Sequence, residues 1–355
     1  MSFEDIFGKK GQVNQTAHAR VNLIGEHTDY TGGFVMPTLL SLNTSVEIAI
    51  NEEKKYQVYS ANFQEKKIFN DFIKSSNNDW VDYVKGCLFV FYDENKNLEN
   101  KHLNIFISSN IPMERGISSS SALCVAVLRS LNSFFQTQFS NKHIAILAQK
   151  VERNYIGVSG GIMDQMVSSI GIHGKAFFLD CLSLKYELLD LPLNWKFYLV
   201  DSQVQRNLRD SSYNERYNQL KKAENDMGVE YLGSVKVENF SENKFSDPVV
   251  FKRAKHVITE NQRVLDAKNY LLENNIEKFG QLMNESHSSY SKDFEASTED
   301  VDIITQRSID AGALGSRLTG GGFGGFTVSL IEKNQYGSWY DTMKKYYSED
   351  KFFEV

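Results

Sequence analysis

The 355-residue sequence contains only three cysteines and four prolines, and what it lacks excludes several classes of protein. The cysteines, Cys87, Cys124 and Cys181, are widely spaced and odd in number, which argues against a disulfide framework or a cysteine zinc site and predicts a reducing, cytoplasmic location. The N-terminal segment is mixed and acidic, unlike a secretory signal. The longest purely apolar runs, such as Cys87–Tyr92, are too short to span a bilayer.

The sequence also lacks a surplus of basic residues. Its 39 Lys and Arg residues are outnumbered by 45 Asp and Glu residues, which gives a formal net charge of −6. The chain as a whole therefore has no excess positive charge for a nucleic acid backbone, and no dense run of Lys and Arg is present. Hydrophobic residues make up 41% and charged residues 24%, as in an ordinary globular protein. A chain of this length predicts about two domains.

Apolar patterns predict a mixed α+β chain with two lobes. Alternation predicts strands at 44–50, 103–108, 175–180, 197–201 and 326–330, and helical spacing predicts helices at 118–135, from a cap at Asn141 onward, at 213–227 and at 251–274. The proline-containing stretch Leu191–Asn194 is the predicted domain boundary, so that the domains are expected at 1–192 and 193–355.

A first candidate site segment is RVNLIGEHTDY, residues 20–30. An apolar stretch ends at Gly25 and is followed at once by Glu26, His27, Thr28 and Asp29. Polar side chains that emerge together suit a site that hydrogen-bonds a ligand rich in hydroxyl groups. A solvated turn with local hydrogen bonds is an equally good interpretation of the residue types alone.

A second segment, PMERGISSSSA at residues 112–122, opens the predicted helix 118–135. A glycine followed by hydroxyl residues at a helix N-terminus offers backbone N–H groups and the positive end of the helix dipole to a phosphate, and a serine can also ligate magnesium. It is not a Walker A loop, because no Gly-Lys-Ser/Thr closes it. Plain N-capping is the alternative, but four serines exceed what one cap requires.

A third segment, TGGGFGG at residues 319–325, has five glycines in six positions, which allows a close approach of backbone to ligand. A flexible linker is the alternative, and the flanking apolar residues Leu318 and Phe326 argue against it. Two acids, Glu152 on the Asn141 helix and Asp164 in GGIMDQM, are candidates for partly buried carboxylates. They have either a functional task or a salt-bridge partner.

Taken together, these segments resemble the galactokinases, members of the GHMP family of small-molecule kinases. RVNLIGEHTDYTGGFVMP resembles the galactokinase signature, and the second segment resembles the family's phosphate loop, P-x-G-x-G-L-S-S-S-A. GGIMDQMVSSIG resembles the segment that carries the catalytic aspartate, and the third segment resembles the glycine-rich third motif. The similarity extends from Arg20 to Leu330.

The resemblance implies a two-lobed GHMP kinase fold with the active site in the cleft between an N-terminal and a C-terminal domain. It implies ATP- and Mg²⁺-dependent phosphorylation of the C1 hydroxyl of α-D-galactose, with galactose and ATP as the partners and a monomer allowed. From the charge and the short apolar runs we expect neither nucleic acid nor membrane as a partner. By position it assigns catalysis to Asp164 and Arg20, sugar binding to Glu26, His27, Thr28, Asp29, Gly161 and Tyr213, ATP binding to Ser60, Glu114, Arg115, Gly116, Ile117, Ser118, Ser119 and Ser120, and magnesium binding to Ser120 and Glu152.

The sequence departs from the family pattern at positions that bear on nucleotide affinity and sugar preference. Ala17–Ala19 replaces an Ala-Pro-Gly, Glu114 stands where a glycine is usual, Ser121 replaces an alanine, and Val204–Leu208 replaces a stretch with an Arg-His pair. A carboxylate at residue 114 repels polyphosphate unless it turns to solvent or pairs with Arg115.

Two rival functions follow from these departures. One is a kinase for a related sugar, such as N-acetylgalactosamine, a uronic acid or a pentose. The other is a catalytically silent protein that senses galactose and ATP, although retention of Asp164, Arg20, Ser120 and Glu152 argues against silence. A dinucleotide oxidoreductase is excluded because the glycines near Gly320 lead into a strand instead of opening a helix.

Overall fold

The computed structural model describes residues 1–76, 79–112, 115–204 and 209–355. It divides into two compact units: unit 1 contains residues 1–19, 41–113 and 118–170, and unit 2 contains residues 20–40, 114–117 and 171–355. The predicted boundary at residue 192 lies within unit 2, so contacts divide the chain differently from the two predicted domains, which stay a prediction. Within the described ranges, no helix is long and apolar enough to cross a membrane.

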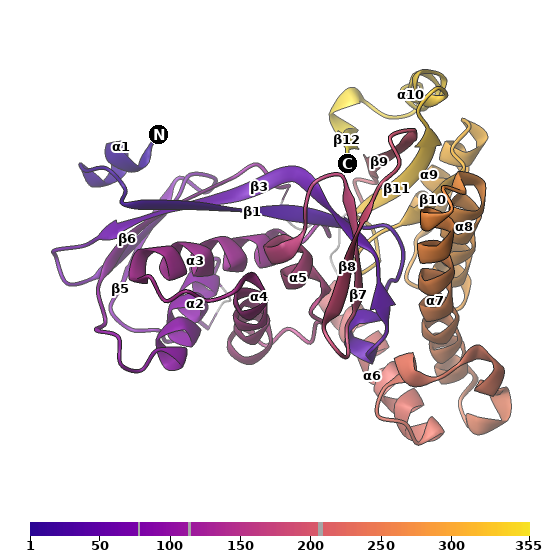
Figure 1. The fold of residues 1–355 in the computed structure, drawn as a ribbon, viewed down its shortest axis with the longest axis horizontal. Helices are drawn as coiled ribbons and strands as arrows, with labels where there is room; N and C mark the ends of the chain where they lie inside the picture. Colours follow the sequence, from indigo (N-terminus) through magenta and orange to yellow (C-terminus); the bar gives the residue numbers. More distant parts are fainter. Residues whose placement is uncertain (77–78, 113–114, 205–208) are drawn as a thin grey trace. The chain divides into compact units, whose positions relative to one another are not determined.

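Unit 1 has a mixed sheet with helices on one of its faces (Figure 1). Apolar residues of the central strands and of these helices form one buried core. The strands are β1 (Val13–Asn22), β3 (Pro37–Ile50), β4 (Tyr56–Ser60), β5 (Glu65–Phe69) and β6 (Leu103–Ser109), and the first residues of β3 and last residues of β1 belong to unit 2. β3 pairs antiparallel with β6 from Thr44↔Ser109 to Ile50↔Leu103, and β6 pairs parallel with β4. The predicted strands at 44–50 and 103–108 are confirmed.

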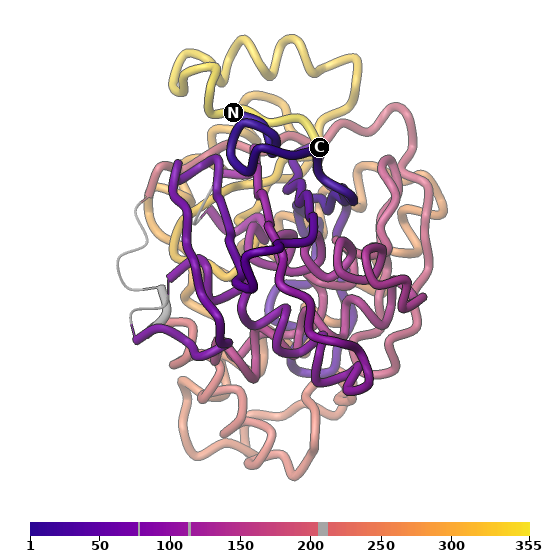
Figure 2. Tube along the Cα trace, turned by 90° about the vertical axis from the view of Figure 1, so that its left-hand side faces the viewer, coloured from indigo at the N-terminus to yellow at the C-terminus, as the bar shows by residue number. Residues whose placement is uncertain are grey.

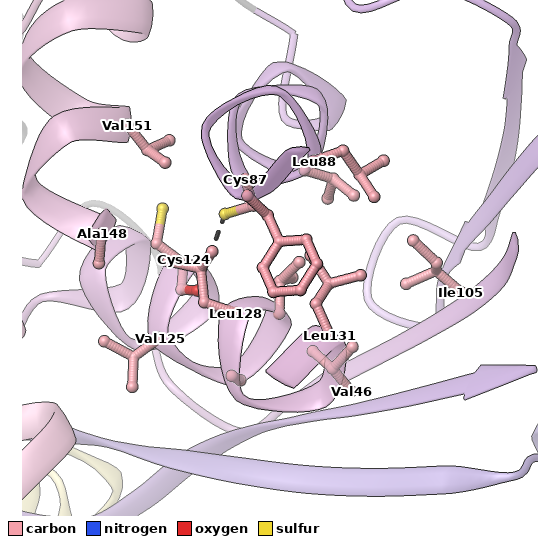
Figure 3. Packing of buried hydrophobic residues seen from close by; sticks show 14 of the residues in the cluster. Val46, Cys87, Leu88, Ile105, Cys124, Val125, Leu128, Leu131, Ala148 and Val151 are labelled. Atoms are coloured by element: carbon pink, nitrogen blue, oxygen red, sulfur yellow. Dashed lines mark hydrogen bonds between the residues drawn. The ribbon is translucent and has the colours of Figure 1, made fainter. Parts of the chain in front are cut away.

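Helices cover one face of this sheet. A short N-terminal helix packs in a second apolar cluster, in which Phe3 lies with Ala49, Tyr59 and Phe106 of the strands. The helices are α1 (Phe3–Phe7), α2 (Val81–Glu94), α3 (Ser119–Phe135), α4 (Asn141–Lys150), a π-helical turn at Val151–Ile156, and α5 (Met163–Ile170). Figure 3 shows part of the core between them, where Cys87 Sγ of α2 donates to Cys124 O of α3 at 3.7 Å. Both cysteines are buried and neither forms a disulfide in the structure.

The predicted cap at Asn141 is wrong by one residue. Ser140 is the N-cap of α4, because its backbone is extended and its hydroxyl accepts a hydrogen bond from His143 N at 3.2 Å. Asn141 is the first helical residue. The helical spacing that continues past Lys150 corresponds to the π-helical turn, where one extra residue per turn shifts the side chains.

Unit 2 contains a second group of strands and most of the long helices. Its strands are β2 (Phe34–Val35), β7 (Lys175–Asp180), β8 (Lys185–Asp190), β9 (Trp195–Asp201), β10 (Gly315–Leu318), β11 (Phe326–Glu332) and β12 (Phe352–Glu354). β7 pairs with β2, β8 and the start of β3, and β10, β11, β9 and β12 form an antiparallel sheet in that order. The predicted strands at 175–180, 197–201 and 326–330 are confirmed within this unit.

Three of the helices described in unit 2 follow a residue whose side chain caps the helix. The α-helices described in this unit are α6 (Arg209–Met227), α7 (Pro248–Leu272), α8 (Ile276–Lys292), α9 (Glu299–Asp310) and α10 (Tyr336–Met343), and the three capped ones are α7, α8 and α9. Asp247 caps α7 by accepting from Val249 N, and Pro248 occupies the first turn, where no N–H partner is needed. In Figures 1 and 2 the turns between α6 and α7, in salmon, lie at the end of unit 2 opposite the C-terminal segment, in yellow.

Candidate active site

The galactokinase-like segment at residues 20–30 lies in unit 2, and most of its polar residues are buried. Glu26, His27 and Thr28 are each no more than 5% exposed, so the alternative of a solvated turn is wrong. Thr28 Oγ1 lies 2.9 Å from Gly25 O and 2.6 Å from Phe34 O, and it thereby fixes the turn. His27 has a φ of 61°, a left-handed conformation that is strained for a non-glycine residue and is found preferentially at functional sites.

The Glu26 carboxylate connects this segment to the glycine-rich third motif. Glu26 Oε1 accepts from Arg317 Nη1 at 3.0 Å and from Gly320 N at 3.0 Å. Arg317, on β10, is fully buried and also donates to Asn22 O at 3.3 Å. A buried charge of this kind is stable only when it is paired and hydrogen-bonded, so the ion pair fixes the two motifs to each other.

A second buried carboxylate, Glu260 on α7, supports the backbone of the same segment. Glu260 Oε1 accepts from Gly25 N at 2.9 Å and from the Ser286 hydroxyl at 2.6 Å, while Arg263 Nε donates to Glu260 Oε2 at 2.8 Å. Burial alone raises the pKa of Glu260, but the Arg263 and Arg317 charges outweigh that effect and hold its pKa well below the usual range. Glu260 is therefore an ionised acceptor at neutral pH.

The His27 ring takes part in a hydrogen-bonded chain with a defined direction. Tyr290 Oη donates to Gly320 O at 2.9 Å, so its oxygen accepts from His27 Nε2–H at 2.9 Å. His27 Nδ1 then accepts from the Tyr30 hydroxyl at 2.7 Å. Burial, and next the neighbouring Tyr213, raises the pKa of Tyr30 well above its usual value, which keeps this donor protonated. The ring nitrogens of His27 thus link Tyr30 to the glycine-rich motif.

The unit 2 part of the phosphate loop contacts the predicted catalytic arginine. Arg20 Nη1 donates to Gly116 O at 2.8 Å, and Arg20 N lies 3.4 Å from Ile117 O. Gly320, at a φ of 83°, lies so close that an added Cβ would be 2.6 Å from Gly116 O, which requires glycine there. Arg115 Nη1 donates to Asp201 Oδ1 at 3.1 Å, and Glu114, a predicted ATP-binding residue, lies outside the described residues.

In unit 1 the serines at the start of α3 contact acids and do not cap the helix. Ser118 is the N-cap residue, but its φ is 65° and its side chain makes no capping hydrogen bond, so the interpretation as a plain cap is wrong. Its hydroxyl donates instead to Asp164 Oδ2, at the start of α5. The excess of serines therefore has a different use, which is to hold the carboxyl groups of neighbouring elements.

Glu152 is the second acid beside these serines, and it lies in the π-helical turn. Ser121 Oγ donates to Glu152 Oε1 at 3.0 Å, Gln165 Nε2 donates to Glu152 Oε2, and Ser120 also hydrogen-bonds the carboxyl group. Burial and then the negative charge of Asp164 raise the pKa of Glu152 to about 7, against these hydrogen bonds, which lower it. A nearby cation would favour the ionised form of this group.

The oxygen atoms near the start of α3 in unit 1 fit a magnesium ion most of whose ligands are water molecules and substrate phosphates. Within the described parts of the chain, no group of three His, Cys, Asp or Glu side chains is placed to hold a metal by itself. Mg²⁺ in phosphoryl-transfer sites is commonly bound by one or two carboxylates together with waters and substrate phosphates. The Ser120 hydroxyl and the Glu152 carboxylate, next to Asp164, supply oxygen ligands of that kind and an excess of negative charge.

The remaining predicted residues have less specific surroundings. Ser60 ends β4, is buried, and its Oγ accepts from Phe63 N at 3.4 Å. Gly161 precedes α5, and Ser119 is the first residue of α3. The Tyr213 ring, on α6, lies 5.4 Å from the His27 ring, as measured between centroids. The predicted binding roles of these residues stay predictions.

Sequence reasoning missed four residues that organise these sites: Arg317, Glu260, Tyr290 and Gln165. Arg317 and Gln165 adjoin motifs, and their positions next to Leu318 and Asp164 are the signal that could have identified them. Glu260 and Tyr290 lie within polar helices, where nothing in the sequence separates them from surface residues. They are recognised only through their burial and their contacts with the segment at residues 20–30.

Family models and known proteins match this chain along most of its length. Models of the GHMP kinase N-terminal domain, the GHMP kinase C-terminal region and the galactokinase galactose-binding signature match residues 82–171, 267–348 and 1–50. Galactokinases from Fusobacterium nucleatum and Lacticaseibacillus casei strain BL23 are 36% and 35% identical to the chain, covering 99% and 98% of it and 94% and 92% of their own lengths.

Solved structures place the fold in the same class. The crystal structure of Lactococcus lactis galactokinase complexed with galactose matches with a TM-score of 0.93 at 31% identity, covering 99% of this chain and 95% of that one. Methanococcus jannaschii mevalonate kinase, at 21% identity and a TM-score of 0.71, covers 96% of this chain and 97% of its own and shares the fold. The fold is thus that of a GHMP kinase, mixed in helix and sheet. The chain belongs to the galactokinase family of the GHMP kinases.

Proposed function

We propose that this protein transfers the γ-phosphoryl group of ATP to the C1 hydroxyl of α-D-galactose, giving galactose 1-phosphate and ADP. The observation that carries the proposal is the match to galactokinases along essentially the whole chain. The largely buried signature segment in unit 2, with hydrogen bonds to Glu260 and Arg317, supports it, since a site for a polyhydroxyl ligand needs fixed polar groups.

Asp164 is the proposed acceptor for the C1 hydroxyl proton. The sugar oxygen attacks the γ-phosphorus, the bond from that phosphorus to the β–γ bridging oxygen breaks, and ADP leaves. The Ser118 hydroxyl, which donates to Asp164 Oδ2, helps to hold the carboxyl group in one orientation. Because phosphoryl transfer needs little covalent help, most of the rate enhancement comes from such positioning and from charge neutralisation.

Arg20 is proposed to stabilise the negative charge that phosphoryl transfer redistributes. Its guanidinium is held at the phosphate loop through Gly116 O, and a buried arginine offers several donors in a fixed plane. Backbone N–H groups at the start of α3 are proposed to bind the phosphates, as helix N-termini commonly do. Mg²⁺, held through Ser120 and Glu152, would neutralise part of the phosphate charge when bound.

Sugar recognition is proposed for the polar groups of residues 26–29, with Gly161 and Tyr213. Glu26 and His27 have their hydrogen-bonding geometry set by Arg317 and by the two tyrosines. Polar groups held in fixed positions suit one arrangement of sugar hydroxyls, so we expect an epimer to make fewer hydrogen bonds and to bind more weakly. The predicted cytoplasmic location and monomeric state stay predictions.

The substitution Asp164→Asn tests the proposed role of Asp164. The amide keeps the size of the side chain but cannot accept the proton, so we expect kcat to fall by about 10²–10⁴-fold while ATP binding is retained. Galactose-dependent ADP release measures kcat, and fluorescence titration with an ATP analogue measures binding. Turnover close to that of the unsubstituted protein would remove Asp164 from catalysis.

A further inference from the structure

Ser121 stands at the position where the phosphate-loop pattern of the family has alanine, and its hydroxyl contacts Glu152. Ser121 is 1% exposed, and its Oγ donates to Glu152 Oε1 at 3.0 Å. The Ser121 hydroxyl is not an N-cap, because Ser121 is the third residue inside α3. Its hydrogen bond therefore serves the carboxyl group.

Gln165, on α5, also donates a hydrogen bond to the Glu152 carboxylate. Its Nε2 donates to Glu152 Oε2 and lies 3.3 Å from Ser121 Oγ, so both amide hydrogens and the serine hydrogen have an acceptor. The two carboxylate oxygens of Glu152 are thus fixed by donors from two different helices. Rotation of the carboxyl group about its last side-chain bond would break both hydrogen bonds at once.

The arrangement leaves acceptor positions for a further ligand. An ionised carboxylate has about four lone-pair positions, and Ser120, Ser121 and Gln165 use three of them. Gln165 Oε1 is buried and has no hydrogen-bond partner in the described structure. A buried acceptor without a partner is costly, by about 1–3 kcal/mol, and the waters that Mg²⁺ retains are donors able to satisfy it.

We propose that Ser121 and Gln165 are positioning residues that hold the Glu152 carboxylate in the orientation that receives the magnesium ion of MgATP. The proposal rests on the proposed function, because the ion is that of the phosphoryl donor. Residues that orient a metal ligand commonly change metal affinity by 10–100-fold when they are substituted. Ser121 adds one such contact at a position where family members commonly have none.

The test measures metal binding separately from catalysis. Mn²⁺ substitutes for Mg²⁺, and its unbound fraction is followed by electron paramagnetic resonance as it is titrated into the full chain with a non-hydrolysable ATP analogue. We expect Ser121→Ala to weaken Mn²⁺ binding about 3–10-fold and Gln165→Met about 10–100-fold, with a galactose KM within about twofold of the unsubstituted value. The Mn²⁺ affinity of the double variant should fall by less than the product of the two single fold-changes, since both residues act on one carboxyl group.

Two serines provide matched controls. Ser130, on α3, donates to Val46 O at 2.9 Å, and Ser168, on α5, donates to His18 O at 2.8 Å, so each is a buried hydroxyl that does not contact Glu152. Ser130→Ala and Ser168→Ala should leave Mn²⁺ affinity unchanged. Equal weakening in the controls, or unchanged affinity in a folded Ser121→Ala variant, would overturn the proposal, as would absence of Mn²⁺ binding by the unsubstituted protein.

Failure of the proposed function gives a different result. If the unsubstituted protein binds Mn²⁺ with nucleotide but releases no ADP with galactose, the proposed reaction fails while the affinity comparison still decides the roles of Ser121 and Gln165. Thermal unfolding of every variant identifies those that lose affinity only because they unfold.

Discussion

Glu260 in unit 2 and Glu152 in unit 1 are both acids that neighbouring side chains hold in place, but the donors around them differ in charge. Glu260 accepts from Arg263 and lies 3.8 Å from Arg317 Nη2, and its pKa is held well below the usual range. The side chains that donate to Glu152 in the described structure are neutral, and burial together with Asp164 raises its pKa to about 7.

The difference indicates two ways of building a binding site. In unit 2, the buried Arg317 and the partly buried Arg263 balance Glu26 and Glu260, so these carboxylates are paired before any ligand arrives. In unit 1, hydroxyl and amide donors orient Glu152 without neutralising it, so a bound cation would stabilise the site. We therefore expect the structure of the segment at residues 20–30 to depend on ion pairs within the protein. We expect the site at the start of α3 to be stabilised by a bound metal ion.

Arg317→Met should have the largest effect on stability. The substitution leaves Glu26 and Glu260 in the interior without one of their cations, and removal of one partner from a buried pair costs about 3–5 kcal/mol. Urea unfolding measures the change. Lys196→Met is the matched control, because Lys196 pairs with the exposed Glu354 and such surface pairs contribute about 0–1 kcal/mol. Equal losses in the two variants would contradict a special role for the buried pair.

The two acids should give stability opposite dependences on pH. A raised pKa means that the folded state binds more protons between the unfolded value of Glu152, 4.5, and about 7, so stability from this group falls as pH rises through that window. Glu260, with a lowered pKa, contributes stability that is lost as pH falls below 4.5.

The substitution Glu152→Gln removes the pH dependence of stability that comes from Glu152 and leaves that of Glu260. Between pH 5 and pH 8, in the presence of EDTA, the variant should gain about 1–3 kcal/mol of unfolding free energy relative to the unsubstituted protein. Urea unfolding at the two pH values measures this gain. A constant difference between the two proteins at both pH values would mean that the Glu152 carboxyl group does not titrate in this range.

Tyr290→Phe should have a smaller effect on stability than Arg317→Met. It removes two hydrogen bonds of the Tyr290 hydroxyl, one from His27 Nε2–H and one to Gly320 O, and each typical hydrogen bond contributes about 0.5–1.5 kcal/mol. Because the link holds the glycine-rich motif to the sugar segment, we also expect the galactose KM to rise. Tyr346→Phe, at an exposed ring, is the control for the loss of a hydroxyl. An unchanged galactose KM would confine Tyr290 to a structural role.

Much of the fold was predictable because one face of each long element is buried. The alternation at residues 44–50 and the helical spacing at 118–135 report that burial directly. The short strands β2 and β10 carry too few residues for a pattern, and the cap of α4 was displaced by one residue because Ser140 precedes Asn141.

The sites were predictable only in part. The run of serines indicated a use beyond capping, and contacts with Asp164 and Glu152 now provide one. The buried partners of Glu26 and Gly25 could not be predicted, because Arg317 and Glu260 are distant in sequence and their helix and strand carry many polar residues. Pairing over such separations depends on tertiary packing, which periodicity does not encode.

The most direct measurement of the central claim is ADP release from ATP and Mg²⁺ with a panel of sugars, with the product identified by NMR. The panel contains galactose, its C4 epimer glucose, 2-deoxygalactose, N-acetylgalactosamine, galacturonic acid and a pentose. Our account predicts rapid ADP release with galactose, little with glucose, and a product phosphorylated at C1. Turnover with another sugar alone, or ATP binding without ADP release on any sugar, would contradict it.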